Sequence, residues 1–202
     1  MEITSEIEDQ LRRFADAVAA SPHNLVSRRA RQELWSRHVQ ESVAVARALP
    51  NGRQRLLDVG SGGGFPGFVI ALVRPELEVH LLDSTRKKTT FLDELAAELD
   101  VPLTVHTGRA EELARGPLAG SFDVVTARAV AALERLIPWT VPFLRPNGLV
   151  YAIKGESWAE ELAAATGVIE RSGARVVATP DEVADGGGSA DRLPHLVILG
   201  RS

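Results

Sequence analysis

A glycine-rich segment constrains this chain more than any other feature. Residues 58–67 read Asp-Val-Gly-Ser-Gly-Gly-Gly-Phe-Pro-Gly and directly follow a leucine pair. This order predicts a buried strand that leads into a glycine loop and then into a helix. Because Gly60, Gly62 and Gly64 lack a β-carbon, the backbone can turn there with positive φ and approach a ligand closely. We expect amide N–H groups of this loop to be free to face that ligand.

A carboxylate follows the glycine loop at an informative distance. Residues 79–83 read Val-His-Leu-Leu-Asp and predict a second strand that ends in Asp83, nineteen positions beyond Gly64. In α/β nucleotide-binding folds, an acidic side chain at this place binds the ribose hydroxyls. The loop and Asp83 together indicate a cofactor that carries adenosine. The spacing of glycines at 62, 64 and 67 also fits dehydrogenases, so the pattern alone leaves the cofactor open.

Composition indicates one globular domain. The chain has 202 residues, 45% of them hydrophobic and 25% charged, which suits one α/β domain with a short extension. No apolar run approaches the about 20 residues of a transmembrane helix, and the first residues lack the pattern of a signal peptide. We therefore expect a cytoplasmic monomer without a membrane partner. The net charge of -4 gives no global attraction to nucleic acid, so such a partner would need a local basic patch.

Cysteine and histidine usage narrows the chemistry. The chain has no cysteine, which excludes disulfides, cysteine metal sites and thiol nucleophiles. Its five histidines do not show the spacing of metal ligands, so we expect no metal.

Two regions follow one another along the chain. Apolar residues at helical spacing predict one helix over residues 3–20, with Ser5 and Glu8 as a capping box, and a second helix through 34–46. We expect residues 1–53 to form a helical extension that packs on the domain formed by 54–202, as one structural unit.

Strand-like and helical segments alternate beyond residue 53, which predicts an α/β fold with a mainly parallel sheet covered on both faces. The predicted strands are 55–60, 77–83, 101–106, 121–126 and 147–153, and the predicted helices lie near 66–74, 86–99, 130–143 and 156–172. Two further strands, 174–179 and 194–199, are predicted to pair antiparallel, with no helix between them. We expect their glycine-rich connector, residues 180–188, to be mobile.

Several motifs resemble those of one family, in the same order. They are the glycine segment at 58–67, Leu-Asp-Ser-x-x-Lys-Lys-x-x-Phe-Leu at 82–92, Gly-Arg-Ala-Glu at 108–111, Phe-Asp-x-Val-x-x-Arg-Ala at 122–129, Ala-Ile-Lys-Gly at 152–155, Asn-Leu at 24–25 and Arg-His-Val-x-x-Ser at 37–42. Over about residues 24–199 the chain resembles the bacterial 16S rRNA guanine-N7 methyltransferases of the G or GidB type. The resemblance implies a seven-stranded Rossmann-like methyltransferase sheet with a C-terminal antiparallel hairpin. It also implies S-adenosyl-L-methionine (AdoMet) as cofactor and, as substrate, the 530-loop region of 16S rRNA, free or in the small ribosomal subunit.

The same resemblance implies which residues bind AdoMet. They are Gly60, Gly62, Phe65, Asp83, Ala110, Glu111 and Arg128. Arg128 also follows the fourth predicted strand, at the sheet edge where ligands bind in such folds. Four of these residues have a plainer alternative: Phe65 as a core aromatic, Asp83 as a strand-end cap, Glu111 as a solvated carboxylate, and Arg128 as a surface ion pair.

Basic residues predict where RNA would bind. Lys87 and Lys88 fall in the first turn of a predicted helix, where cations oppose the helix dipole, and an RNA phosphate would offset that cost. Arg37 and His38 belong to a locally basic N-terminal segment, and Lys154 ends the fifth predicted strand. We expect these five residues to contact RNA; extended, solvated side chains are the alternative for the lysines.

Methylation of guanine N7 requires little acid–base chemistry. The reaction is an in-line displacement, which needs donor and acceptor about 3 to 3.5 Å apart and aligned. N7 already carries a lone pair and no proton, so we predict no catalytic residue beyond a role for Arg128 near the incoming base. Cytosine C5 methylation needs a cysteine nucleophile, which the chain lacks. Amine methylation usually accompanies an Asn/Asp-Pro-Pro-aromatic loop, whereas residues 123–129 read Asp-Val-Val-Thr-Ala-Arg-Ala.

Other functional classes share some of these features. An NAD-dependent dehydrogenase would have the same glycine spacing and Asp83, and titration with AdoMet against NAD separates the two. A non-catalytic AdoMet-fold RNA-binding protein would bind the cofactor without turnover. A small-molecule methyltransferase is disfavoured by the basic N-terminal segment.

Overall fold

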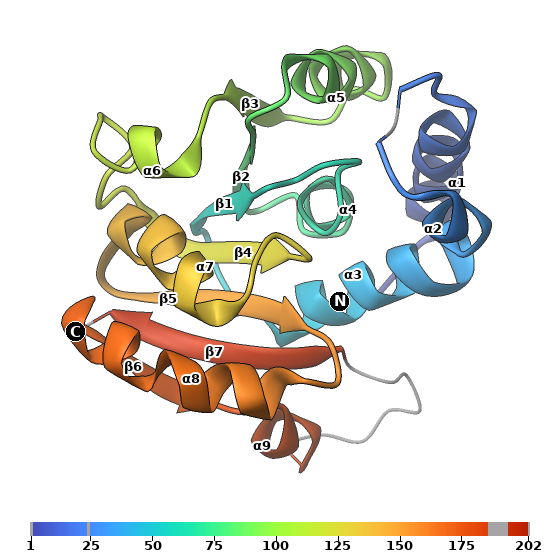
Figure 1. Cartoon of the computed structure of the whole chain (residues 1–202). Helices are drawn as coiled ribbons and strands as arrows, with labels where there is room; N and C mark the ends of the chain where they lie inside the picture. Colours follow the sequence, from blue (N-terminus) through green and yellow to red (C-terminus); the bar gives the residue numbers. More distant parts are fainter. Residues whose placement is uncertain (1, 24, 186–193, 202) are drawn as a thin grey trace.

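In the computed structural model, which describes residues 2–23, 25–185 and 194–201, a seven-stranded sheet forms the centre of the molecule (Figure 1). The strands are β1 (Arg55–Val59), β2 (Glu78–Asp83), β3 (Leu103–Thr107), β4 (Phe122–Arg128), β5 (Leu144–Lys154), β6 (Ala174–Ala178) and β7 (His195–Arg201). Their order across the sheet is β3-β2-β1-β4-β5-β7-β6. Strands β1 to β5 pair in parallel, and β7 is antiparallel to both β5 and β6. The predicted sheet, mostly parallel with an antiparallel C-terminal pair, is thereby confirmed.

Helices cover both faces of the sheet (Figure 1). The structure describes α1 (Ser5–Ala20), α2 (Arg28–Gln32), the π-helix η1 (Leu34–Val39), α3 (Gln40–Ala48), α4 (Gly67–Val73), α5 (Arg86–Glu98), α6 (Ala110–Leu113), α7 (Leu133–Thr140), the 3-10 helix η2 (Val141–Phe143), α8 (Trp158–Arg171) and α9 (Pro180–Asp185). Apolar side chains of α1, α3, α4 and α5 form one core with Leu56, and those of α7 and α8 form the other with Leu57. Adjacent strand residues point to opposite faces, so the leucine pair anchors both layers.

The N-terminal helices share the first of these cores. Phe14 of α1 stacks on Phe68 of α4, with ring centroids 4.6 Å apart, and also contacts the ring of Phe65 at 5.1 Å. Both Phe14 and Phe68 are fully buried. Helices α1 and α3 therefore lie against the segment that follows β1, which is where the glycine loop is.

Some local predictions were wrong. The N-cap of α1 is Thr4, whose hydroxyl accepts from the Ile7 amide at 3.3 Å, so Ser5 is not the cap of a Ser5–Glu8 box. The predicted second helix is interrupted, because η1 has π-helical geometry before α3 begins at Gln40.

The connector between β6 and β7 contains a helix, contrary to our expectation. Helix α9 starts at Pro180, and the Glu182 carboxylate accepts from the amide of Thr179 at 2.7 Å and from its hydroxyl at 2.9 Å. This is one half of a capping box, and proline is favoured at the first helical position. The rest of the predicted mobile connector, residues 186–188, lies outside the described residues.

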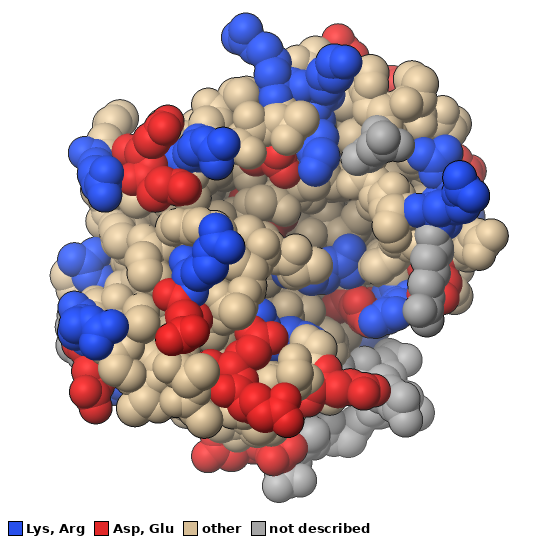
Figure 2. All heavy atoms as spheres, in the orientation of Figure 1, with Lys and Arg blue, Asp and Glu red and all other residues tan. Residues whose placement is uncertain are grey.

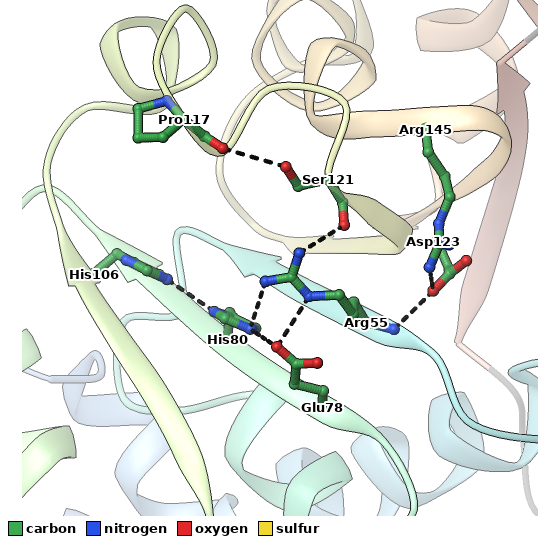
Figure 3. A network of polar contacts seen from close by, with 8 residues as sticks. All are labelled: Arg55, Glu78, His80, His106, Pro117, Ser121, Asp123 and Arg145. Atoms are coloured by element: carbon green, nitrogen blue, oxygen red, sulfur yellow. Dashed lines mark hydrogen bonds and ion pairs between the residues drawn. The ribbon is translucent and has the colours of Figure 1, made fainter.

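A polar network joins the strands at the amino end of the sheet (Figure 3). Arg55, the first residue of β1, pairs with Glu78 of β2 at 2.9 Å, and its amide donates to Asp123 of β4 at 2.8 Å. On β2 and β3, Nδ1 of His80 lies 2.9 Å from Nε2 of His106. These contacts tie four neighbouring strands together, from the amino ends of β1 and β2 to His106 near the end of β3.

Candidate functional site

A cleft of about 1670 Å³ lies at the carboxyl ends of β1, β4 and β5. Its walls come from residues 60–63 and Phe65 after β1, from η1 and the start of α3, and from residues 129–132 and 154–157 after β4 and β5. Figure 2 shows the surface hollowed near the centre of this face, with Lys and Arg side chains above the hollow and acidic side chains below it. Ligands of open α/β sheets bind at this edge of the sheet.

The segment 60–63, called here the glycine hinge, turns sharply after β1. Gly60 and Gly62 have φ of +74° and +56°. The amide of Gly60 donates to the Leu82 carbonyl at 2.7 Å, and that of Gly62 donates to Oδ2 of Asp83 at 3.0 Å. Our expectation of free amides is therefore wrong for these two glycines, because the turn itself uses them. What the hinge offers a ligand is space: a β-carbon at Gly62 would have no heavy atom nearer than 3.7 Å.

Asp58, at the end of β1, ties the hinge to its surroundings. Its Oδ1 accepts from the Thr126 hydroxyl at 2.8 Å and its Oδ2 accepts from the Gly67 amide at 3.1 Å. Burial raises the pKa of Asp58 to about 6, although these two donors act in the opposite direction. Asp58 thus joins β1, β4 and the start of α4 directly beneath the cleft.

Asp83 stands beside the hinge at the end of β2. Its carboxylate accepts from the amides of Gly62 and Thr85, the latter at 2.8 Å, and each oxygen keeps a further lone pair. The Gly108 amide donates to the Asp83 carbonyl at 3.1 Å, which brings the start of α6, with Ala110 and Glu111, to the same edge of the sheet. In the described part of the chain, these three residues lie next to the cleft lining and not within it. Their contacts with a cofactor stay predictions.

Arg128 is held in the cleft wall by residues of the N-terminal helices. Its Nη1 lies 2.7 Å from Nδ1 of His38 and 3.2 Å from Oε2 of Glu41, and its guanidinium lies 5.4 Å from the ring centre of Phe65. The Arg128 side chain is only 14% exposed. A solvated surface ion pair therefore does not describe this arginine, because its partners fix it at the cleft. Phe65 is itself buried and packed on Phe14, so it also belongs to the core.

His38 is a neutral ring with a defined orientation. Burial, followed by the charge of Arg128, lowers the pKa of His38 to about 4. Because arginine can only donate, Nδ1 must accept, and the ring proton resides on Nε2. That Nε2 is buried and has no hydrogen-bond partner among the described residues.

Glu41 was missed by the sequence analysis. Its two oxygens serve two arginines, since Oε1 accepts from Nε of Arg37 at 2.9 Å and Oε2 accepts from Arg128. Arg37 also pairs with Glu33 at 3.4 Å and remains 54% exposed at the mouth of the cleft. The available signal was the spacing of four residues between Arg37 and Glu41, which places both on one helix face.

The three lysines of the chain differ in their surroundings. Lys87 is exposed on the first turn of α5, and Lys88 lines the cleft 3.9 Å from Oδ2 of Asp83. Lys154 also lines the cleft, but its ammonium lies 2.8 Å from the Ala131 carbonyl and 2.6 Å from Oε2 of Glu161. All three predicted RNA contacts stay untested, and that of Lys154 would compete with these two partners.

Two kinds of feature are absent from the part of the chain that the structure describes. Among residues 2–23, 25–185 and 194–201, no three His, Cys, Asp or Glu side chains are grouped so that they could hold a metal ion. No helix in the described part of the chain is long and apolar enough to cross a bilayer.

Comparison with known sequences identifies close relatives. The family model described as rRNA small subunit methyltransferase G (GidB) matches residues 7–186. The ribosomal RNA small subunit methyltransferase G of Sorangium cellulosum is 47% identical over 154 residues, which are 73% of this chain and 64% of the relative. The protein of that name from Mycolicibacterium paratuberculosis is 39% identical over 191 residues, 94% of this chain and 75% of the relative. The match thus spans less than two thirds of the Sorangium protein and of the one from Salinispora tropica, of which it covers 63%.

Solved structures with the same fold are more distant in sequence. A TehB-like SAM-dependent methyltransferase from Corynebacterium glutamicum superposes with a TM-score of 0.59 at 15% identity, over 97% of each chain. A ribosomal protein L11 methylase from Lactobacillus delbrueckii gives a TM-score of 0.56 at 20% identity, over 81% of this chain and 77% of that one. These similarities establish a Rossmann-like methyltransferase fold.

Proposed function

The chain belongs to the rRNA small subunit methyltransferase G family, and from this premise we propose that it transfers a methyl group from AdoMet to N7 of a guanine in 16S rRNA, in the 530-loop region. One observation carries the proposal: a single cleft brings together Gly60, Gly62, Phe65 and Arg128, which the family motifs associate with the cofactor. A dehydrogenase is not favoured, because the family match extends over most of the chain.

The residues at the hinge suit AdoMet. A β-carbon would fill the space that Gly62 leaves open, and the Asp83 carboxylate beside it has lone pairs to accept from ribose hydroxyls. Ala110 and Glu111, at the same sheet edge, are proposed to flank the adenine. When bound, AdoMet supplies a methyl group activated on a positively charged sulfur.

The charges in the cleft wall suit a cationic methyl donor. An isolated guanidinium near a sulfonium would repel it, but Glu41 lies 3.2 Å from Nη1 of Arg128 and offsets that charge. His38 adds no further positive charge, because its lowered pKa keeps the ring neutral at neutral pH. We propose that the Arg128 N–H groups not taken by these two partners orient the incoming guanine.

The chemistry requires positioning more than proton transfer. Guanine N7 attacks with an existing lone pair, so the protein has to align donor and acceptor and exclude competing water. The rigid attachment of Arg128 to Glu41 and His38 suits such a task, since a fixed side chain costs little reorganisation when the base arrives.

RNA binding is proposed to depend on the basic side chains around the cleft. Arg37, Lys87 and Lys88 would contact phosphates, and His38 would lie nearest the base. Phosphate contacts of this kind weaken as salt rises and carry no sequence information, so base choice would reside in the cleft. We further propose that the protein acts as a monomer in the cytoplasm, on free 16S rRNA or on the small subunit.

A binding experiment and a transfer experiment test the proposal in sequence. Calorimetric titration with AdoMet, and separately with NAD, should give binding with AdoMet alone. Labelled AdoMet is then incubated with 16S rRNA and with small subunits from cells that lack the chain, and the labelled nucleotide is identified. Label on guanine N7 is expected. Binding of NAD without AdoMet, or label on another atom, would refute the assignment.

A further inference from the structure

A partly buried ion pair between β5 and α8 fixes the loop that follows Arg128. Nζ of Lys154 lies 2.8 Å from the carbonyl of Ala131 and 2.6 Å from Oε2 of Glu161. The same Glu161 oxygen accepts from the amide of Leu133, the first residue of α7, at 3.1 Å. The Lys154 and Glu161 side chains are 7% and 22% exposed. Residues 129–132, called here the β4–α7 loop, are thus held at the carbonyl of Ala131 and, directly after the loop, at the amide of Leu133.

This loop also touches the glycine hinge. The two methyl carbons of Val130 lie 2.6 and 3.4 Å from the position that a β-carbon on Gly60 would occupy. Ala129 has φ of +54°, a left-handed conformation that is uncommon for a residue with a side chain. Backbone in such a conformation persists only where its surroundings hold it, and here Lys154 and Glu161 supply two of the contacts.

Stability alone does not account for the ion pair. Removing charges from water costs free energy that their attraction often only balances, and an apolar pair of similar size is often equally stabilising. What an apolar pair could not do is hold the Ala131 carbonyl and the Leu133 amide at the same time. The specific contribution of the pair is therefore the placement of the β4–α7 loop.

We propose that Lys154 and Glu161 are positioning residues, which hold the β4–α7 loop against the glycine hinge and so shape the wall of the cofactor cleft. The proposal rests on AdoMet being the cofactor, as proposed above. It assigns Lys154 a role different from RNA contact, because both partners of its ammonium belong to the protein. Loosening the loop should displace Val130 and Arg128 together and weaken AdoMet binding.

Substitutions with matched controls separate the two roles of Lys154. Lys154→Met removes the ammonium, and Glu161→Ala removes its partner and the acceptor of the Leu133 amide. Lys87→Met makes the first change at an exposed lysine and is a control for hydrogen exchange alone, because Lys87 is itself a proposed RNA contact. Glu160→Ala makes the second change at the exposed neighbour of Glu161. Glu161→Gln keeps an oxygen that can accept from both partners and should restore much of the function. The double variant with Lys154→Met and Glu161→Ala leaves no unpaired charge, so it remains informative if a single variant fails to fold.

Hydrogen exchange of the free protein tests the positioning directly. The amide of Leu133 and the peptides over residues 129–136 should exchange faster in Lys154→Met and in Glu161→Ala than in the wild type. The two controls should exchange at the wild-type rate in the same peptides. Wild-type exchange in the folded variants would overturn the proposal, and this result does not depend on any cofactor.

Binding measurements test the consequence for the site. We expect AdoMet affinity to fall by about tenfold to a hundredfold in both single variants, because each displaces part of the cleft wall that would contact the cofactor. The double variant should bind AdoMet no more weakly than the single variant with the lower affinity, because both changes release the same loop. Glu161→Gln should bind more tightly than Glu161→Ala.

The salt dependence of RNA binding distinguishes the competing role. A lysine that neutralises one phosphate contributes about one to the slope of log affinity against log salt. Lys154→Met should keep the wild-type slope. Unchanged AdoMet affinity together with a slope reduced by about one would overturn the proposal and make Lys154 an RNA contact. A wild-type protein that fails to bind AdoMet would refute the proposed function, and the exchange experiment would still decide whether the pair holds the loop.

Discussion

Nη1 of Arg128, the last residue of β4, lies 2.7 Å from Nδ1 of His38, which precedes it by 90 positions in the chain. The contact brings the N-terminal helices into the wall of the cleft. Since Glu41 contributes a second contact, Arg128 is held by two side chains of the N-terminal helices. The cleft wall thus contains an arginine in a fixed position.

Replacing Arg128 tests its place at the reacting groups. Arg128→Ala should lower the rate of rRNA methylation by about tenfold to a hundredfold, because the base loses a positioned donor. We expect only a small change in the melting temperature, so the loss of rate is not a loss of fold. Arg135→Ala makes the same change at an exposed arginine of α7 and should methylate normally. A wild-type rate of methylation by Arg128→Ala would show that Arg128 does not act at the reacting groups.

The neutral state of His38 predicts a dependence of stability on pH. In the unfolded chain His38 takes up a proton near its ordinary pKa of 6.5, whereas in the folded protein its pKa is lowered to about 4. Between these values the unfolded state binds more protons, so the free energy of unfolding falls as the pH falls. His38 should lower the free energy of unfolding by about 1 kcal/mol when the pH falls from about 7 to about 5. Solvent screening of the partly exposed ring keeps this loss small.

Urea unfolding of the wild type and of His38→Gln measures this contribution. Other groups also titrate in this range, among them Asp58 with its pKa raised to about 6, so the comparison uses the difference between the two proteins. The free energy of unfolding of the wild type minus that of the variant should become smaller as the pH is lowered. A difference that is independent of pH would show that His38 is not held neutral.

Removing the donor to Asp58 should destabilise the fold. Thr126→Val preserves the shape of a fully buried side chain but leaves Oδ1 of Asp58 without the hydroxyl at 2.8 Å. We expect a loss of about 1 to 3 kcal/mol in the free energy of unfolding, the usual cost of a buried acceptor left unpaired. Thr140→Val is the control, because that buried hydroxyl donates to the carbonyl of Leu136 within its own helix. Equal losses in the two variants would contradict the special role of Asp58.

A side chain at Gly60 should abolish AdoMet binding. Gly60→Val places a β-branched residue at φ of +74°, where its β-carbon would meet a methyl carbon of Val130 at 2.6 Å. The β4–α7 loop or the hinge must then shift at the cleft. Gly116→Val is a control for folding, because a β-carbon there has no contact shorter than 3.5 Å. Retained AdoMet affinity in Gly60→Val would contradict the assignment of the hinge.

The sheet and the hinge were predictable because their signals are local. Leu56 and Leu57 are apolar neighbours that serve both faces, and the glycines after them mark the turn. Helix α9 was also predictable in principle, since Thr179 and Glu182 have the spacing of a capping box.

Contacts between residues far apart in the chain could not be predicted from such local signals. The apolar residues at 34–46 predicted one α-helix, whereas residues 34–39 form the π-helix η1, which contains the His38 that contacts Arg128. Likewise, the approach of Lys154 to Ala131 and Glu161 depends on the packing of β5, the β4–α7 loop and α8, and no short motif encodes it.

Mass mapping of 16S rRNA from cells with and without this chain tests the proposed methyl transfer itself. We predict that one guanine in the 530-loop region carries a methyl group on N7 in the presence of the chain and lacks it in its absence. Expression of the wild-type chain should restore the methyl group, and expression of Arg128→Ala should restore much less. Identical methylation of the 16S rRNA in both cells would contradict the account.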